Sequence, residues 1–376
     1  MERRTRAVFM RGGTSKGVVF RGDDLPGDEA ERDDLLRHVL GSPDPYGRQL
    51  NGMGGGISSL SKALWVTRSE RNDSDIDYTF AQVAVDSPVI DLSANCGNMT
   101  SAMGPFAVDE EVFPIDDGDT ILRMHNTNTN KCIHAGFQVA DGRAVSRGDL
   151  KIPGVAGSGA PVRLEFMDPS GIAGRGVLPT GNVQDVIDAP GFGEISVTIC
   201  DSAALCVFAP AEALGLNGSE GPDEIDARPD IAAAMEAIRR QAAVLSGFAP
   251  SAEAAPLSAP KVALVGPPET FTALDGRDII PPSFDIAVRM ASMGKIHRAV
   301  PLTGAMCLAT AVAIDGTVAH NLSGGQGPAG DLRMGNPSGV LTTSASVNKI
   351  SDGWQVESTT AYRTYRRLMD GFVYHP

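Results

Sequence analysis

Short apolar or alternating runs that end at glycine, proline, aspartate or asparagine recur along the chain, a pattern typical of β-strands. We predict strands at five of these runs, because each carries β-branched, aromatic or other apolar residues at strand spacing. They cover residues 18–20, 63–66, 78–85, 120–124 and 162–166. Strands therefore outnumber helices in the expected fold.

Two segments have the apolar spacing of amphipathic helices. Residues 28–40 have an acidic first turn, and we expect this helix to stop at Gly41. In residues 230–246, Asp230 is the expected N-cap and Gly247 the expected end.

Two more helices are predicted directly after polar turns of small residues. One starts near residues 96–98, with Pro105 as a kink or an end. The other starts near residues 303–304 and runs to Ile314. Both follow a strand, and both are apolar and rich in alanine.

These two helix starts form a weak internal repeat. When Gly97 is aligned with Gly304, Cys96 lies opposite Thr303. The length of 376 residues also suggests two domains, and 43 glycines with 25 prolines favour a loop-rich, strand-rich protein. We therefore predict a two-domain pseudo-repeat with an α+β or barrel-like half on each side of a cleft.

Charge and cysteine content narrow the function classes. The chain has 32 Lys and Arg against 46 Asp and Glu, a net charge of −14, which argues against nucleic acid or an anionic membrane as the main partner. Five cysteines without a CxxC motif indicate reduced thiols. No apolar run is long enough for a signal peptide or a membrane helix, so we expect a cytoplasmic protein that acts on a small molecule.

Several motif matches fail on their context. Residues 13–17 match G-x-S-x-G, but a strand rather than a helix follows them. Residues 52–56 are rich in glycine without forming a dinucleotide-binding motif, and residues 294–295 lack the Ser or Thr of a phosphate-binding loop. The six histidines show no metal-ligand spacing. We expect neither a cofactor nor a metal.

The turn at residues 95–98, Asn-Cys-Gly-Asn, is the strongest candidate for chemistry. It places the thiol of Cys96 at a helix N-terminus, where free N–H groups and the helix dipole favour a thiolate and a bound carboxylate. A small buried cysteine at a helix cap is the alternative. The two asparagines and the glycine favour the functional interpretation, because they offer donors to a substrate without steric cost.

Other polar loops carry weaker signals. Lys62 follows a glycine- and serine-rich loop, and a solvated lysine at a strand edge is the alternative. Residues 11–16 have the composition of an anion-binding turn, and a polar hairpin turn is the alternative. The loops at 294–298 and 333–339 are further candidates that could equally be surface.

Together these segments resemble the PrpF family, the 2-methylaconitate cis–trans isomerases with a diaminopimelate-epimerase-like fold. The resemblance runs in family order from Arg11 to residues 370–373 and so covers nearly the whole chain. It rests on residues 11–17 (RGGTSKG), 41–47 (GSPDPYG), 52–55 (GMGG), 61–62 (SK), 95–98 (NCGN), 179–182 (PTGN), 292–297 (SMGKIH) and 336–339 (NPSG).

The resemblance implies an α+β fold of two pseudo-symmetric domains. Each is a mostly antiparallel sheet wrapped around a central helix, with the active site in the cleft between the domains and no cofactor. On this basis we place the N-terminal domain at residues 1–183 and 345–376 and the C-terminal domain at residues 184–344.

The resemblance also assigns the site residues. The family's catalytic lysine and cysteine fall on Lys62 and Cys96. Thr303 stands where the epimerase branch has a second cysteine, so two-thiol racemisation is not expected, and Cys307 is expected to be a core thiol. The expected substrate-binding residues are Arg11, Gly12, Thr14, Ser15, Ser61, Asn95, Gly97, Asn98, His297, Thr303, Gly304 and Ser338.

The expected reaction is a one-proton cis–trans or allylic isomerisation of an unsaturated polycarboxylate, with Lys62 or Cys96 as the base. The substrate is expected to be 2-methylaconitate of the methylcitrate route of propionate catabolism. The alternatives are 4-oxalomesaconate, trans-aconitate or methylitaconate, a non-catalytic accessory protein and a proline-racemase-like enzyme. The sequence does not determine the oligomeric state, and a homodimer is one open alternative.

Overall fold

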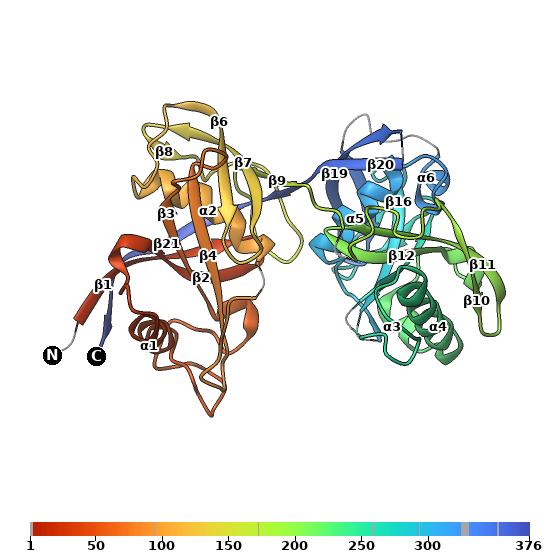
Figure 1. The fold of residues 1–376 in the computed structure, drawn as a ribbon, viewed down its shortest axis with the longest axis horizontal. Coiled ribbons are helices and arrows are strands. Elements are labelled where there is room, and N and C mark those ends of the chain that lie inside the picture. The colour runs from red at the N-terminus through yellow and green to blue at the C-terminus, as the bar shows by residue number, and fades with distance from the viewer. Residues whose placement is uncertain are drawn as a thin grey trace. The chain divides into compact units, whose positions relative to one another are not determined.

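The chain folds into two compact units, shown by a computed structural model that describes residues 3–93, 95–171, 173–257, 259–292, 294–324, 331–351 and 353–376 (Figure 1). Unit 1 comprises Met1–Glu165 and Tyr362–Pro376, and unit 2 comprises Phe166–Ala361. The domain boundaries expected from the sequence, after residues 183 and 344, stay a prediction. The two units are used below as the structure defines them.

Unit 1 is built on a mostly antiparallel sheet with two α-helices in its described residues. Its strands pair in the order β21–β1–β2–β3–β4–β6–β7–β8, with parallel pairs only at β2/β3 and β4/β6 among these. The elements are β1 (Arg3–Gly12), β2 (Ser15–Arg21), η1 (Gly22–Asp24), α1 (Glu29–Leu40), η2 (Ser58–Leu60), β3 (Lys62–Arg68), β4 (Ile76–Val83), β5 (Ile90–Asp91), α2 (Gly97–Asp109), β6 (Gly118–Asn126), β7 (Lys131–Ala140), β8 (Arg143–Ala144), β9 (Val162–Met167), which runs on into unit 2, and β21 (Tyr365–His375).

Unit 2 has a similar sheet with four helices in its described residues. Its strands pair in the order β10–β11–β12–β13–β16–β18–β19–β20. The elements are β10 (Asp185–Ala189), β11 (Gly193–Ser202), β12 (Ala204–Pro210), η3 (Ala211–Leu214), α3 (Pro222–Asp226), α4 (Pro229–Leu245), β13 (Lys261–Gly266), β14 (Phe271–Thr272), β15 (Asp278–Ile279), β16 (Ile286–Ser292), β17 (Lys295–Ile296), α5 (Leu302–Ala313), α6 (Val318–Leu322), β18 (Leu332–Asn336), β19 (Gly339–Ile350) and β20 (Gly353–Arg363), which ends in unit 1.

The two sheets repeat one topology. The pairs β1/β2, β2/β3, β3/β4, β4/β6 and β6/β7 are antiparallel, parallel, antiparallel, parallel and antiparallel. The pairs β11/β12, β12/β13, β13/β16, β16/β18 and β18/β19 follow the same sequence of directions. In each unit one long apolar helix precedes the next-to-last of these strands. The predicted α+β class, with two similar sheets each around a central helix, is confirmed.

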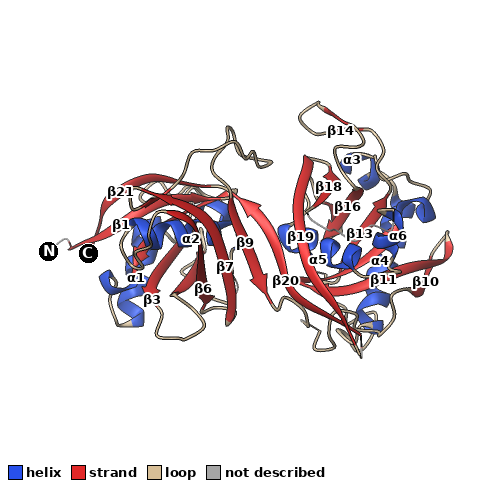
Figure 2. Ribbon diagram, turned by 90° about the horizontal axis from the view of Figure 1, so that it is seen from above, coloured by secondary structure: helices blue, strands red, loops and turns tan. Residues whose placement is uncertain are grey.

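The central helices α2 and α5 are buried on all sides because their sequences carry almost no charge. Every residue from Met99 to Val108 of α2 is buried, as is every residue from Gly304 to Val312 of α5. A helix that is apolar all round is stable only inside a core, and Figure 2 shows α2 among the strands of its own unit. Pro105 lies inside α2 and does not end it, since the helix continues to Asp109.

The two predicted amphipathic helices are α1 and α4, and they differ in how their N-termini are capped. In α1, Asp28 is the N-cap and accepts from Glu31 N, and Gly41 ends the helix at a φ of 73°. The N-cap predicted for α4 is wrong: Arg228 occupies that position with Pro229 at N1, and the Asp230 carboxylate pairs with the Arg228 guanidinium instead. No helix in the described ranges has the length and apolar character that a membrane crossing requires.

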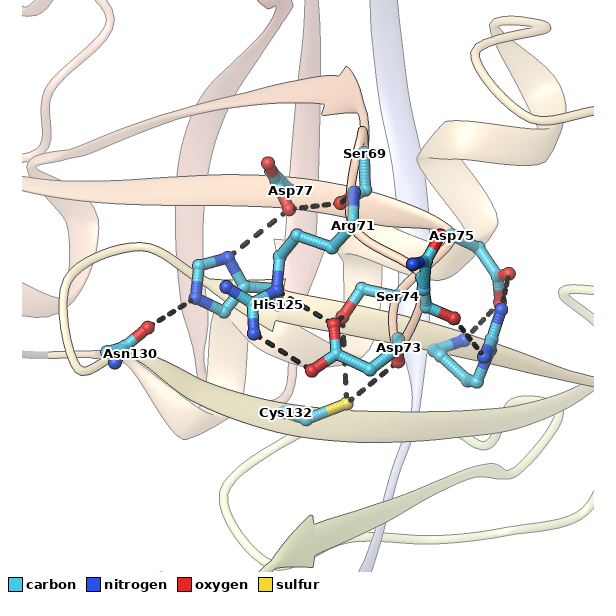
Figure 3. A network of polar contacts seen from close by, with 11 residues as sticks. Ser69, Arg71, Asp73, Ser74, Asp75, Asp77, His125, Asn130 and Cys132 are labelled. Carbon is cyan, nitrogen blue, oxygen red and sulfur yellow. Dashed lines mark hydrogen bonds and ion pairs between the residues drawn. The ribbon is translucent and has the colours of Figure 1, made fainter.

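The same aspartate–arginine contact recurs in both units at the start of β4 and of β16. Asp75 accepts from the backbone N of Arg123 at 2.8 Å and from its Nη2 at 2.6 Å (Figure 3), and Asp285 accepts from the same two atoms of Arg333 at the same distances. Burial opposes ionisation of Asp75 and Asp285, but these hydrogen bonds outweigh it and lower the pKa of each carboxyl. Each contact joins two parallel neighbouring strands.

We expect Asp75→Asn and Asp285→Asn each to lower the free energy of unfolding by about 1–2 kcal/mol at pH 7, because a hydrogen bond to a charged group is lost. A carboxyl with a lowered pKa in the folded state stabilises the protein above its unfolded pKa, and this contribution disappears as the pH falls through its folded pKa. Urea unfolding at pH 7 and below about pH 4 measures both effects. The exposed Asp119→Asn is the control, and equal losses at both pH values would contradict the assignment.

Candidate active site

Lys62 is the first residue of β3, and its side chain is buried with 6% exposure. Its Nζ lies 2.5 Å from Gln82 Oε1 and 4.9 Å from the centre of the Phe80 ring. Gln82 is held in this orientation because its Nε2 donates to Ser58 O at 3.0 Å and to Ser61 O at 2.9 Å. The sequence alternative of a solvated lysine at a strand edge is therefore wrong.

The electrostatic environment of Lys62 favours a neutral amine. Burial lowers the pKa of its amino group, and the electrostatic interaction with Cys96 opposes this lowering. Among the described residues, no carboxylate forms an ion pair with Lys62. A lysine of this kind can accept a proton at a lower pH than an exposed lysine can.

Cys96 is the N-cap residue of α2, and its side chain makes no capping hydrogen bond. The first backbone donor that bonds within the helix is Thr100 N, to Cys96 O at 3.0 Å. The N–H groups of the first turn have no intrahelical partner, so this end of α2 can receive an anion. Cys96 Sγ lies 3.9 Å from Ser15 Oγ, so the turn before β2 lies beside the start of α2.

That turn, residues 12–15, fits against α2 only because it begins with two glycines. A Cβ on Gly12 would lie 2.6 Å from Asn98 O, and one on Gly13 would lie 2.2 Å from Asn98 Oδ1. Gly13 also has a φ of 51°, a region that other residues rarely adopt. Thr14 N donates to Asn98 Oδ1 at 3.4 Å. The Arg11 guanidinium fixes the turn by donating to Gly13 O at 2.9 Å.

A buried hydrogen-bond network supports the turn before α2 from behind. Asn95 Oδ1 accepts from Thr100 Oγ1 at 3.3 Å and from Asn126 Nδ2 at 3.5 Å. Thr100 Oγ1 also lies 3.0 Å from the Tyr78 hydroxyl, and burial raises the pKa of Tyr78 so that its phenol stays neutral. Sequence reasoning missed Tyr78 and Asn126, although their even spacing along β4 and β6 could have placed them on the inner face of the sheet.

Ser61 is buried and forms hydrogen bonds that hold the glycine-rich loop before β3. Its hydroxyl is fully buried, donates to Val83 O at 2.8 Å and accepts from Gln49 Nε2 at 2.7 Å. Gln49 Oε1 in turn accepts from Gly56 N at 2.9 Å. Gln49, which the sequence did not single out, thus ties the glycine-rich segment to the residue before Lys62.

The α5 start in unit 2 differs from that of α2. Its N-cap is Pro301, so the helix begins at Leu302, one residue before the predicted turn. Thr303 is exposed in the first turn, and Gly304 is buried, where a Cβ would lie 2.4 Å from Met290 Sδ.

His297 and Ser338 lie near this part of unit 2. His297 Nε2 is buried and has no hydrogen-bond partner in the described ranges, and burial together with the charge of Lys261 lowers the pKa of its ring. Ser338 Oγ donates to Arg298 O at 2.6 Å, which joins its loop to the segment after β17. The substrate-binding role expected for these two residues stays a prediction.

A second polar cluster lies on unit 1 at the β3–β4 turn and along β6 and β7 (Figure 3). Arg71 pairs with Asp73 at 2.8 Å, while the two ring nitrogens of His125 contact Asp77 at 3.2 Å and Asn130 at 2.9 Å. Because these groups satisfy one another, we interpret the cluster as a structural link. Within the described ranges, no three His, Cys, Asp or Glu side chains are placed to hold a metal ion.

Comparison with known proteins identifies the family of the chain. A family model described as "PrpF protein" matches residues 2–376. The chain belongs to the PrpF family. Its PrpF relatives include a 2-methyl-aconitate isomerase of Shewanella oneidensis, at 38% identity over 98% of this chain and 96% of the relative.

Two further relatives extend the comparison. A 3-methylitaconate isomerase of Eubacterium barkeri is 38% identical over 99% of this chain and 97% of the relative. The crystal structure of a methylitaconate-delta-isomerase superposes with a TM-score of 0.92 at 36% identity, covering 99% of this chain and 96% of that chain. This PrpF-family protein is therefore an isomerase.

We expect the amino group of Lys62 to titrate at a lower pH than those of exposed lysines, because its side chain is buried. Cys96→Ser should lower the pKa of Lys62 further, since it removes the electrostatic interaction that opposes the effect of burial. Acetic anhydride labelling at a series of pH values, read by mass spectrometry of the Lys62 peptide, gives the titration midpoint. Exposed Lys151 in the same digest is the internal control, and an upward shift in the variant would contradict the assignment.

Proposed function

We propose that this protein isomerises an unsaturated polycarboxylate, with 2-methylaconitate as the substrate, by proton transfer at Lys62 and Cys96. The observation that carries the proposal is the buried Lys62 amine, which lacks a carboxylate partner in the described ranges and is coupled electrostatically to a thiol at an uncapped helix start. Such a pair supplies a base beside a site that holds negative charge.

In the proposed reaction, Lys62 or Cys96 removes a proton from a carbon that is α or vinylogous to a carboxylate. The C–H bond breaks, an N–H or S–H bond forms, and the electron pair delocalises into an enolate-like anion. The free N–H groups at the start of α2 stabilise this added charge. Rotation about the bond that has lost double-bond character, followed by return of the proton, gives the isomer without any net oxidation or reduction.

The substrate class follows from the charge around the site. The protein as a whole carries a charge of −14, which repels a polycarboxylate. Near the turn at residues 12–15, however, the hydrogen bonds that Arg11 donates to described residues go to backbone carbonyls, and burial together with the charge of Arg366 lowers the pKa of Arg11. Cations held close together without carboxylate partners favour a ligand that supplies several carboxylates.

The choice of 2-methylaconitate rests on the sequence resemblance and on the relative from Shewanella oneidensis. Methylitaconate, 4-oxalomesaconate and trans-aconitate present similar carboxylates and stay the alternatives. We also propose a cytoplasmic location, because Cys96, Cys132, Cys200, Cys206 and Cys307 are all free thiols. His297, Thr303, Gly304 and Ser338 are proposed as further substrate-binding residues.

We expect Lys62→Ala and Cys96→Ser each to lower kcat/KM for 2-methylaconitate by about 100- to 10,000-fold, the usual contribution of a general acid or base. Isomerisation is followed by ultraviolet absorbance, and proton exchange by NMR in deuterated solvent. The variant that loses exchange as well as isomerisation identifies the group that starts the reaction. Lys151→Ala is the control, and full activity in both site variants would refute the proposed mechanism.

A panel of 2-methylaconitate, methylitaconate, 4-oxalomesaconate and trans-aconitate, ranked by kcat/KM, tests the substrate. We expect 2-methylaconitate to rank first. A higher kcat/KM for another compound of the panel would identify that compound as the substrate and would leave the proposed mechanism unchanged.

A further inference from the structure

Arg363, the last residue of β20, is a buried cation without a carboxylate partner. Its side chain lies in unit 1 and is 8% exposed. Nε donates to Asn98 Oδ1 at 3.2 Å, and Nη1 donates to Tyr362 O at 2.9 Å. Within the described ranges, no carboxylate lies within ion-pair distance of this guanidinium, and Nη2 makes no hydrogen bond. Burial lowers the pKa of Arg363 to about 10.

Other sheltered arginines of this protein satisfy their charge. Arg367 pairs with Glu110, and Arg239 pairs with Glu236. Arg289, which also lacks an ion pair in the described part of the chain, donates to three backbone carbonyls and lies 4.7 Å from the centre of the Phe271 ring. Among the described residues, Arg363 has no ion pair and no ring contact, and it donates to one backbone carbonyl and one amide oxygen. A buried charge without an ion pair raises the free energy of the folded protein unless a ligand supplies the opposite charge.

The contact with Asn98 places Arg363 at the candidate active site. Asn98 is the second residue of α2, two positions after Cys96, and the same Oδ1 atom accepts from Thr14 N. The guanidinium therefore lies beside both the free N–H groups of α2 and the glycine turn. Its planar fork of donors matches the two oxygens of a carboxylate better than a single ammonium does.

We propose that Arg363 binds one carboxylate of the polycarboxylate substrate. This inference rests on the proposed function and adds a specificity-determining residue to it. The C–H carbon would then be held between one carboxylate fixed at Arg363 and the base, while the start of α2 receives the charge that develops during the reaction. Substrates that lack the matching carboxylate should lose the contribution of Arg363.

The test compares Arg363→Gln with Arg363→Lys and with the exposed control Arg147→Gln. The probes are tricarballylate, which has three carboxylates and no double bond to isomerise, glutarate, which lacks its central carboxylate, and methylsuccinate, which lacks one terminal carboxylate. Inhibition constants are measured against 2-methylaconitate or whichever panel substrate the wild-type protein turns over. Thermal unfolding of each variant checks the fold.

We expect Arg363→Gln to raise the inhibition constant of tricarballylate roughly 10- to 100-fold and to raise KM by a similar factor, because a charge-assisted bidentate pair is lost. Of the two dicarboxylates, the one that lacks the carboxylate bound by Arg363 should bind to the variant less than about 2-fold more weakly than to the wild type. Arg363→Lys should fall between the wild type and Arg363→Gln, because it keeps the charge and loses the fork. Arg147→Gln should leave all constants unchanged.

Equal weakening of all three inhibitors would show a structural role for Arg363 and overturn the inference, as would unchanged constants. In both cases turnover by the wild-type protein would leave the proposed function intact. If the wild-type protein turned over no polycarboxylate and bound none of the probes, the proposed function itself would fail. Should Arg363→Gln not fold, a crystal structure of the wild-type protein with tricarballylate decides: a carboxylate at the Arg363 guanidinium supports the inference, and one bound elsewhere overturns it.

Discussion

The candidate site of unit 1 depends on how closely the uncapped start of α2 approaches the turn between β1 and β2. The approach is possible because Gly12 and Gly13 have no Cβ where Asn98 backbone and side-chain atoms lie. At this distance Asn98 Oδ1 bonds to the turn on one side and to Arg363 on the other. A normal N-cap side chain would occupy the free N–H groups. The residue at that position is Cys96, which leaves them open.

Two buried basic side chains give the site its electrostatic character. Lys62 lies on β3 and Arg363 at the end of β20, and neither has a carboxylate within ion-pair distance among the described residues. In a protein with a net charge of −14 there is no shortage of carboxylates to pair with them. The missing partners are therefore a local property of the site, which favours an anionic ligand over the protein's own acidic residues. The affinity for an anionic ligand must therefore come from short-range contacts within the site, since the net negative charge of the protein repels anions.

Periodicity was enough to predict four helices and five of the strands, because strands and helices differ in where their apolar residues recur. Helix ends were less predictable. The start of α4 depends on an ion pair that removes Asp230 from the capping role, and α2 continues through Pro105 because the residues after it are buried. The candidates Lys62 and Cys96 were visible in the sequence and in its resemblance to a family. The roles of Gln82 and Arg363 were not, since they depend on contacts across 20 and 265 residues of chain.

The two halves of the internal repeat differ at the start of the central helix, which places the thiol that we propose for proton transfer in one unit. Both units keep the aspartate–arginine contact and a lysine at the start of the equivalent strand, Lys62 in β3 and Lys261 in β13. The helix starts differ, because α5 has Pro301 as its N-cap and the exposed Thr303 opposite Cys96. The cysteines of unit 2 are all buried, and burial raises the pKa of Cys307 well above its usual range. A thiol in the core cannot exchange a proton with a ligand. Cys96 of unit 1 is therefore the thiol that we propose for proton transfer, which suits an isomerase that moves one proton and not a racemase that needs a thiol on each face of its substrate.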